Sequence, residues 1–236
     1  MYVIPVSLLC AHAQKFCIDI VFLQIYVCKT GFNVMKYFNQ QQGTGSKMTQ
    51  IIALAGSLRS QSYNKSLVKI AAQGAEEQGA HVVYVDLADY PIPLFSEDLE
   101  EEGTPAAVND LKHLFAQSQG ILVASPEYNG SISGVLKNVI DWLSRPSQGV
   151  DIDSAFDGKV AAIMAASPGG LGGLRGLGHM RDVLNNLGVI VSPKQVAVPA
   201  AYEAFNDDGE VNDVELEQRI KALGAQVANI ASRLND

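Results

Sequence analysis

Apolar and polar positions alternate between two patterns from residue 50 to the end of the chain. Short runs rich in apolar and β-branched residues predict strands that are covered on both faces of a sheet. They span residues 50–56, 81–87, 120–125, 159–167 and 188–199. Between and after them, apolar residues recur at steps of three and four, which predicts helices. These span residues 67–75, 106–115, 133–143, 177–187 and 216–234.

Five strand–helix alternations predict an α/β fold, a doubly wound parallel sheet with helices on both faces. Right-handed crossovers leave few topologies, and five strands suit the flavodoxin-like order 2-1-3-4-5. Residues 48–236 show neither an internal repeat nor a second core, so we expect one domain. In such a sheet, ligands bind at the carboxyl ends of the strands, beside the loops that follow strands 1, 3 and 4.

Residues 1–47 do not fit this alternation. They are apolar and aromatic, but Lys15, Asp19 and Lys29 interrupt every run before it reaches the roughly 18–20 residues of a membrane-spanning helix. A secretory signal begins with a basic segment, but here no basic residue precedes Lys15. Met48 then stands just before the first strand, like the start of a protein. We expect residues 1–47 to be a disordered extension; a targeting or membrane-associating segment is the alternative.

The charge narrows the class of partner. The chain carries −8, yet residues 1–47 hold four lysines and one aspartate, or +3, so the remainder holds −11. An acidic body disfavours nucleic acid and anionic membranes as partners. No cysteine follows Met48, which excludes a thiolate metal site there and favours the cytoplasm. The histidines lack a second ligand at metal-binding spacing, so we expect no metal site.

The first polar cluster, GSLRSQSYN, spans residues 56–64 and joins the first strand to a helix. A helix N-terminus offers unpaired amides and a dipole that favours an anion. Arg59 can donate two hydrogen bonds to a phosphate. The cluster lacks the Walker motif and the three-glycine dinucleotide fingerprint. A simpler interpretation is that Ser62 or Asn64 caps the helix and Arg59 is solvated, and this cluster alone leaves both open.

Two further clusters follow strands 3 and 4. SPEYNGSISG contains Tyr128, on which a flat heteroaromatic ring would pack, although Asn129 and Ser131 could also cap the next helix. The carboxylate of Glu127 is expected to bond loop amides or a partner subunit rather than act as a base. SPGGLGGLRGLG, after strand 4, indicates a backbone that approaches a ligand closely, or a mobile loop.

Together, GSLRSQSYN, PEYNGSISGVLKNVIDWLSRP and the glycine-rich loop resemble the NAD(P)H-dependent FMN reductase family, which includes chromate, quinone and azo reductases. The resemblance begins near Ile51 and leaves residues 1–47 untouched. It implies FMN as the cofactor. The loop after strand 1 would hold the phosphate, the loop after strand 3 would lie along the isoalloxazine ring and ribityl chain, and the loop after strand 4 would border the ring. The residues so implied are Ser57, Arg59, Ser62 and Asn64; Pro126, Glu127, Tyr128, Asn129 and Ser131; and Ser167, Gly169, Gly170 and Gly172.

The resemblance further implies an enzyme that passes a hydride by ping-pong transfer from NADPH or NADH, through FMN, to a small acceptor. The flavin carries the chemistry, so no catalytic side chain is expected. Family members are dimers or tetramers, and the 142–145 end of a helix is a candidate contact. The alternatives are a non-enzymatic FMN electron carrier and a regulatory flavoprotein.

Overall fold

The computed structural model describes residues 48–146 and 155–234. The expectation that residues 1–47 form a disordered extension therefore lies outside the described residues.

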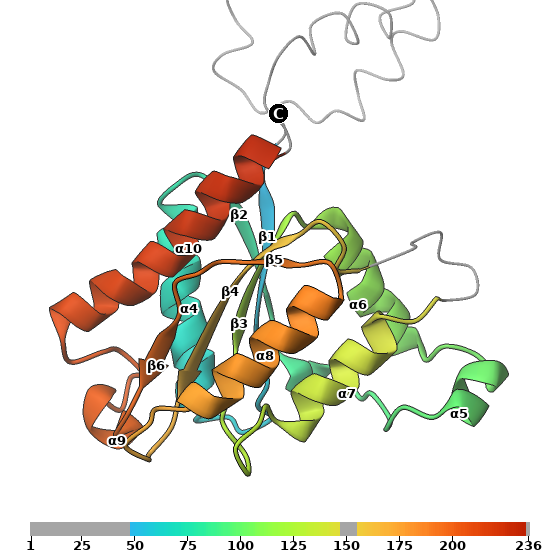
Figure 1. Ribbon diagram of the computed structural model, residues 1–236, viewed down its shortest axis with the longest axis horizontal. Helices are drawn as coiled ribbons and strands as arrows, with labels where there is room; N and C mark the ends of the chain where they lie inside the picture. Colours follow the sequence, from blue (N-terminus) through green and yellow to red (C-terminus); the bar gives the residue numbers. More distant parts are fainter. Residues whose placement is uncertain (1–47, 147–154, 235–236) are drawn as a thin grey trace, which may run out of the picture. The chain divides into compact units, whose positions relative to one another are not determined.

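A parallel sheet forms the centre of the described chain (Figure 1). Its path is β2-β1-β3-β4-β5, and β6 pairs with the far end of β4. The strands are β1 (Gln50–Ala55), β2 (His81–Val85), β3 (Gly120–Ala124), β4 (Val160–Ala166), β5 (Ile190–Val191) and β6 (Val196–Val198). The predicted flavodoxin-like fold and strand order are confirmed.

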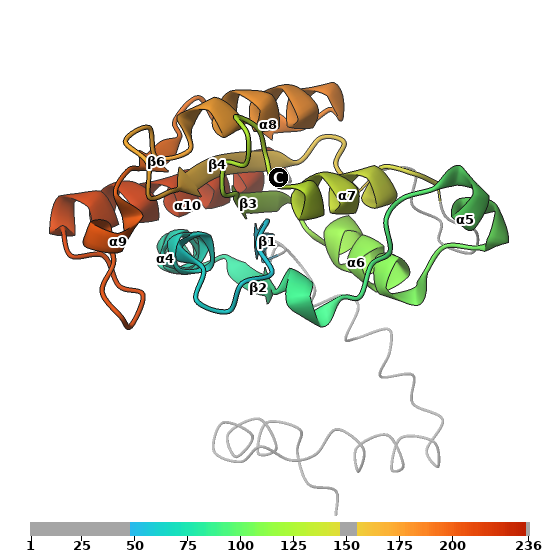
Figure 2. The ribbon, with the colours of Figure 1, turned by 90° about the horizontal axis from the view of Figure 1, so that it is seen from below.

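Helices cover both faces of this sheet (Figure 2). On one face lie α4 (Tyr63–Glu76) and α10 (Val214–Leu234). On the other lie α6 (Ala106–Gln117), α7 (Gly134–Leu143) and α8 (Leu174–Asn186). Successive strand residues point to opposite faces, so Ile51 packs with the first group and Ile52 with the second. Within the described ranges, no helix is long and apolar enough to cross a membrane.

Two glycines let α4 and α10 pack against each other with almost no space between their backbones. A Cβ atom on Gly74 would collide with the carbonyl oxygen of Lys221, and one on Gly224 would collide with that of Ala71. Each helix thus supplies a glycine at the point where the other helix's backbone comes closest. This contact fixes α4, and with it the loop that precedes α4.

The last predicted strand is divided in two. β5 pairs with the start of β4 and β6 with its end, because Pro193 interrupts the run and has no amide to donate to a ladder. The guanidinium of Arg181 donates to the carbonyl oxygens of Val191 and Ser192, so it replaces the missing ladder hydrogen bonds at the interruption. The prediction of one continuous strand over 188–199 was therefore wrong in detail.

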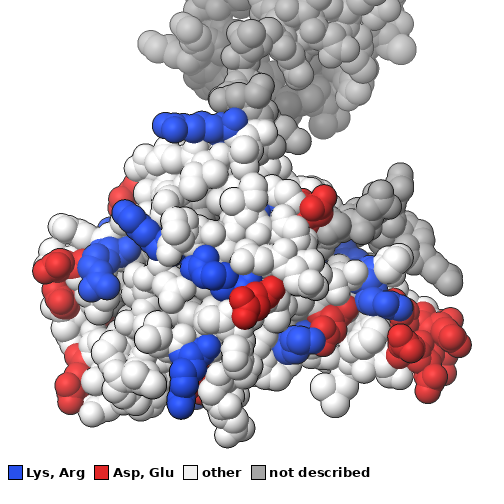
Figure 3. Space-filling view, in the orientation of Figure 1, with Lys and Arg blue, Asp and Glu red and all other residues white. Residues whose placement is uncertain are grey.

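The remaining described elements are short. They are η1 (Leu87–Asp89), α5 (Glu97–Glu102) and α9 (Ala201–Ala204). The carboxylates of α5 gather in one acidic patch, at the lower right of Figure 3. Arg145, just past α7, donates to Glu100 of α5. Trp142 is fully buried and donates to the carbonyl oxygen of Pro93. The subunit contact expected at the 142–145 end of this helix stays a prediction.

Candidate functional site

Direct hydrogen bonds join the loops that follow β1, β3 and β4 at one edge of the sheet. The amide of Gly56 donates to the carbonyl oxygen of Ala124 (2.8 Å), which connects the ends of β1 and β3. The buried hydroxyl of Ser133 donates to the carbonyl oxygen of Gly56 (2.6 Å). The amide of Ser125 donates to the carbonyl oxygen of Met164, which connects β3 to β4. The three predicted clusters therefore lie side by side.

The loop between β1 and α4 presents unpaired donors. Ser62 occupies the N-cap of α4 and is only 5% exposed, yet its side chain makes no capping hydrogen bond. No other described residue accepts a hydrogen bond from the backbone amides of residues 58–64. The guanidinium of Arg59 lies over the ring of Tyr63, 5.3 Å from its centroid. Helix capping thus does not explain this cluster, and its donors are available to an anion.

Asn64 is placed differently from the other members of this loop. Its side-chain nitrogen donates to the carbonyl oxygen of Ala166, and its side-chain oxygen accepts from the backbone amide of Ala166. Both hydrogen bonds are 2.9 Å long. Asn64 therefore joins the start of α4 to the end of β4. The contact between Asn64 and a phosphate stays a prediction.

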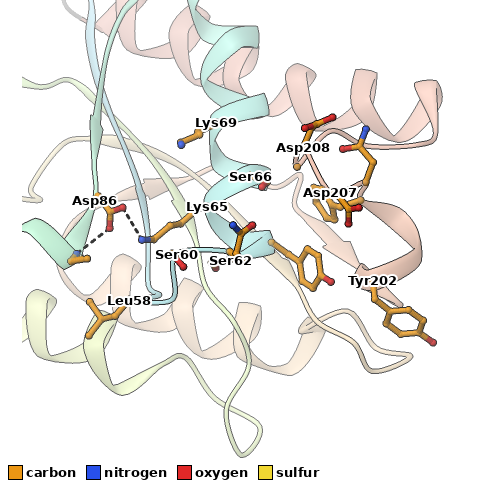
Figure 4. Close-up of a pocket in the computed structure, with 16 residues that line it drawn as sticks. Leu58, Ser60, Ser62, Lys65, Ser66, Lys69, Asp86, Tyr202, Asp207 and Asp208 are labelled. Atoms are coloured by element: carbon orange, nitrogen blue, oxygen red, sulfur yellow. Dashed lines mark hydrogen bonds and ion pairs between the residues drawn. The ribbon is translucent and has the colours of Figure 1, made fainter.

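A cavity of about 570 Å³ opens beside the loop, between α4 and residues 205–209 (Figure 4). Ser62 lines it, so the environment of this buried hydroxyl is reachable from solvent. The ammonium group of Lys65 lies 2.7 Å from the carboxylate of Asp86 in its wall. Burial raises the pKa of Asp86, but hydrogen bonds from Lys65 and the amide of Ala88 outweigh burial and hold that pKa below its ordinary value.

The loop after β3 forms a tight turn. The amides and carbonyl oxygens of Tyr128 and Ser131 are paired across it, at 2.9 and 3.1 Å. Asn129 and Gly130 lie between them, both with left-handed backbones (φ 52° and 80°), as such turns require. Neither Asn129 nor Ser131 caps α7, because Ser133 does so by accepting from the amide of Leu136. Tyr128 is 59% exposed, which leaves its ring free to pack on a ligand.

Glu127 is bound to the first turn of α8. Its carboxylate accepts from the amides of Arg175 (3.1 Å) and Gly176 (3.3 Å) and from the Arg175 side chain (2.7 Å). Burial raises the pKa of Glu127, but the hydrogen bonds from Arg175 and Gly176 prevail and lower it. As expected, this carboxylate bonds backbone amides and not a substrate position, but the amides belong to the first turn of α8 and not to a loop. A carboxylate held ionised in this way is unsuited to serve as a general base at neutral pH.

The glycine-rich loop after β4 contains two kinds of position. A Cβ on Gly172 (φ 62°) would lie 2.6 Å from the backbone nitrogen of Pro199, so this glycine is required by the protein's own backbone. A Cβ on Gly170 would meet no atom within 4 Å, and one on Gly169 would meet only the Ser167 hydroxyl, at 3.7 Å. Backbone at these last positions is open to a ligand, whereas Gly172 serves packing.

The sequence did not single out Ser133 or His179 as functional. Ser133 caps α7 and bridges two loops, and its place immediately before a helix is the signal that could have found it. His179 of α8 lies with Nδ1 2.9 Å from the Ser131 hydroxyl, a contact that no sequence spacing indicates. Among the residues that the structure describes, no group of three His, Cys, Asp or Glu side chains could hold a metal.

A flavodoxin-like sheet with unpaired backbone donors after β1 and an exposed aromatic turn after β3 is typical of proteins that bind a mononucleotide. The model of the family described as NADPH-dependent FMN reductase matches residues 49–203. The chain belongs to this family, and the resemblance in its sequence is confirmed.

Proteins that are similar to this chain in sequence or structure are NAD(P)H-dependent reductases. An NAD(P)H-dependent FMN reductase of Pseudomonas aeruginosa is 36% identical over 179 residues, which covers 74% of this chain and 92% of that protein. An NAD(P)H:quinone oxidoreductase of Solanum tuberosum is 34% identical, covering 78% and 94%. The structure is similar to FerB, a flavoenzyme NAD(P)H:(acceptor) oxidoreductase from Paracoccus denitrificans, with a TM-score of 0.67, 27% identity, and coverage of 79% and 98%. The chain is therefore an oxidoreductase of the FMN-dependent, NAD(P)H-consuming kind.

Proposed function

We propose that this protein transfers a hydride by a ping-pong reaction from NAD(P)H, through FMN, to a small acceptor, and that a quinone is the acceptor class. The observation that carries the proposal is the set of unpaired donors at residues 58–64, which lies at the same edge of the sheet as the exposed Tyr128. Membership of the FMN reductase family and the quinone oxidoreductases among its relatives support it.

The loop residues fit the phosphate of FMN. A phosphate dianion needs several donors and a positive potential, and it finds both at a helix N-terminus with a guanidinium beside it. Ser57, Arg59 and Ser62 would hold the phosphate together with the loop amides. Ser57 and Ser62 are buried and close to these amides in the chain, and Arg59 is exposed. Asn64 would act through the backbone of Ala166, which it holds in place.

The other two loops would cover the ring system. Tyr128 offers an aromatic face, and the open backbone at Gly169 and Gly170 permits close approach of a flat ring. When bound, FMN supplies the hydride chemistry, and the protein contributes position and apolar cover. Pro126, Asn129 and Ser131 belong to the turn that this assignment places along the ring. Glu127 shapes the turn from α8, and Gly172 fixes the loop after β4.

Chromate, free flavin and azo compounds are further candidate acceptors that the family resemblance implies. A homodimer or homotetramer in the cytoplasm completes the proposal. The cysteine-free sequence after Met48 supports the cytoplasmic location.

Anaerobic stopped-flow spectroscopy tests the proposal in two half-reactions. FMN-loaded protein should lose its visible absorption when mixed with NADPH or NADH, and it should recover that absorption when a quinone is added after the nicotinamide product is removed. Steady-state rates at several quinone concentrations should give parallel double-reciprocal lines. Intersecting lines would contradict the ping-pong order. Bleaching that reverses only with a partner protein would favour the electron-carrier alternative.

A further inference from the structure

The exposed side chain of His179 contacts the turn after β3. Its imidazole is exposed on α8, and its Nδ1 atom lies 2.9 Å from the hydroxyl oxygen of the half-buried Ser131. The helix and the turn are close: a Cβ at Gly176 would lie 3.2 Å from the carbonyl oxygen of Ser131. One side of the Ser131 hydroxyl therefore faces a ring that can exchange protons with water.

Other contacts hold this pair in place. Glu127, at the other end of the same turn, is bonded to the amides of Arg175 and Gly176, one helical turn before His179. The backbone of Ser131 is paired with that of Tyr128. The turn is thus attached to α8 at two points, and Ser131 keeps its place beside the imidazole.

A hydroxyl in this position can pass a proton on. When Nδ1–H of His179 donates to the oxygen of Ser131, the Ser131 O–H is free to donate to a third group. We propose that His179 and Ser131 form a proton relay from solvent to the oxygen of a quinone that is reduced at this site. The relay rests on the proposed function, which places the turn containing Ser131 beside the reacting groups.

The reaction requires such a proton. A quinone takes up two electrons and two protons when it becomes a hydroquinone; the hydride from NAD(P)H brings both electrons and one of the protons. In the relay, the O–H bond of Ser131 breaks as a bond forms to the quinone oxygen. The Nδ1–H bond of His179 breaks as the Ser131 hydroxyl is restored, and the ring regains its proton from water. NAD(P)H is oxidised and the quinone is reduced.

Replacement of His179 separates relay from positioning. In His179→Asn the side-chain amide occupies nearly the place of Nδ1 and can keep the hydrogen bond to Ser131, but it cannot transfer a proton. His179→Ala loses both functions. His113→Asn, on the exposed surface of α6, is the matched control. Each variant is loaded with FMN, bleached anaerobically with NADPH, and mixed with benzoquinone or with ferricyanide, which accepts electrons without taking up protons.

The relay predicts that both His179 variants are reoxidised by benzoquinone at least about 10-fold more slowly than wild type, with ferricyanide rates unchanged. His179→Asn should also keep its FMN dissociation constant within about twofold, as expected for a retained hydrogen bond. Equal benzoquinone rates in His179→Asn and wild type would overturn the relay. Equal slowing of His179→Asn with benzoquinone and with ferricyanide would show positioning alone and also overturn it.

A second readout requires no cofactor. In the FMN-free protein, nitrogen NMR should show the Nδ1 resonance of His179 shifting when Ser131 is replaced by alanine, and an unchanged resonance would refute the hydrogen bond and the relay. Wild-type protein that NADPH does not bleach would refute the proposed function together with the relay. Bleaching of the wild type, with unaffected variants, would refute the relay alone.

Discussion

The side-chain amide of Asn64 forms a closed pair of hydrogen bonds with the backbone of Ala166, 102 residues further along the chain. Both residues are buried, at 3% and 2% exposure. The pair fastens the first turn of α4 to the last residue of β4. The loop between β1 and α4 and the glycine-rich loop are consequently held together without a ligand.

Replacing Asn64 with alanine should lower the free energy of unfolding by about 2 kcal/mol, because the amide and carbonyl of Ala166 lose their partner while they remain buried. Urea unfolding of the FMN-free protein measures this. Asn229→Ala, on the exposed side of α10, is the control and should change the free energy of unfolding by less than about 0.5 kcal/mol. Equal stability of the two variants would contradict a structural role for Asn64.

The Lys65–Asp86 pair should make stability depend on acid pH. The folded-state pKa of Asp86 lies below its ordinary value of 3.8, so the folded protein binds this proton less readily than the unfolded chain. The stabilisation is present above pH 3.8 and is lost as the pH falls through the folded pKa. Asp86→Asn should cost about 2 kcal/mol at pH 7, with the difference from wild type shrinking toward pH 3.

Urea unfolding at both pH values measures this difference, with the exposed Asp207→Asn as control. A deficit of Asp86→Asn that is as large at pH 3 as at pH 7 would show that the ionised carboxylate is not its source.

Two glycines of one loop should respond differently to the same substitution. Gly172→Ala places a Cβ 2.6 Å from the backbone of Pro199 and requires a left-handed backbone, so it should destabilise the protein by about 2 kcal/mol or more. Gly170→Ala meets no atom within 4 Å and should stay within about 0.5 kcal/mol. Thermal melting of the FMN-free variants compares them. Similar melting temperatures would contradict the packing role of Gly172.

Arg59 should serve retention of FMN and not the chemistry. Its guanidinium lies over Tyr63 and forms no ion pair with another described residue. Arg59→Ala should weaken FMN binding about 10-fold, since a charge-assisted hydrogen bond contributes about 1.5 kcal/mol. The rate at which NADPH bleaches the flavin that stays bound should change less than about twofold, which is well below the effect of losing one such hydrogen bond. Stopped-flow measurement at saturating FMN separates the two effects, and an equal loss in both would refute this division.

The sequence predicted the sheet order and the three loops because these depend on local patterns. Continuous apolar runs identify buried strands, and parallel topology brings their carboxyl ends to one edge. Pro193 is also a local signal, and its effect on the last strand could have been foreseen.

The partners within the site could not be predicted, because they join residues that are distant in sequence. The side chain of Asn64 is of a type that can bind a phosphate or cap a helix, and only the fold shows that its partner is Ala166. Gly172 has the same side chain as Gly170, yet only Gly172 meets β6. His179 has no companion at metal-ligand spacing, and its contact with Ser131 depends on how α8 crosses the turn after β3.

The most direct test of the account compares FMN with riboflavin, which has the same ring and ribityl but no phosphate. If the donors of residues 58–64 bind the phosphate, fluorescence titration should show FMN binding at least about 100-fold more tightly than riboflavin, the ratio expected from two charge-assisted hydrogen bonds. Arg59→Ala should reduce this ratio about 10-fold, as expected for the loss of one such bond, and the exposed Arg219→Ala should leave it unchanged. Equal affinity for the two flavins, or no binding of FMN, would contradict the account.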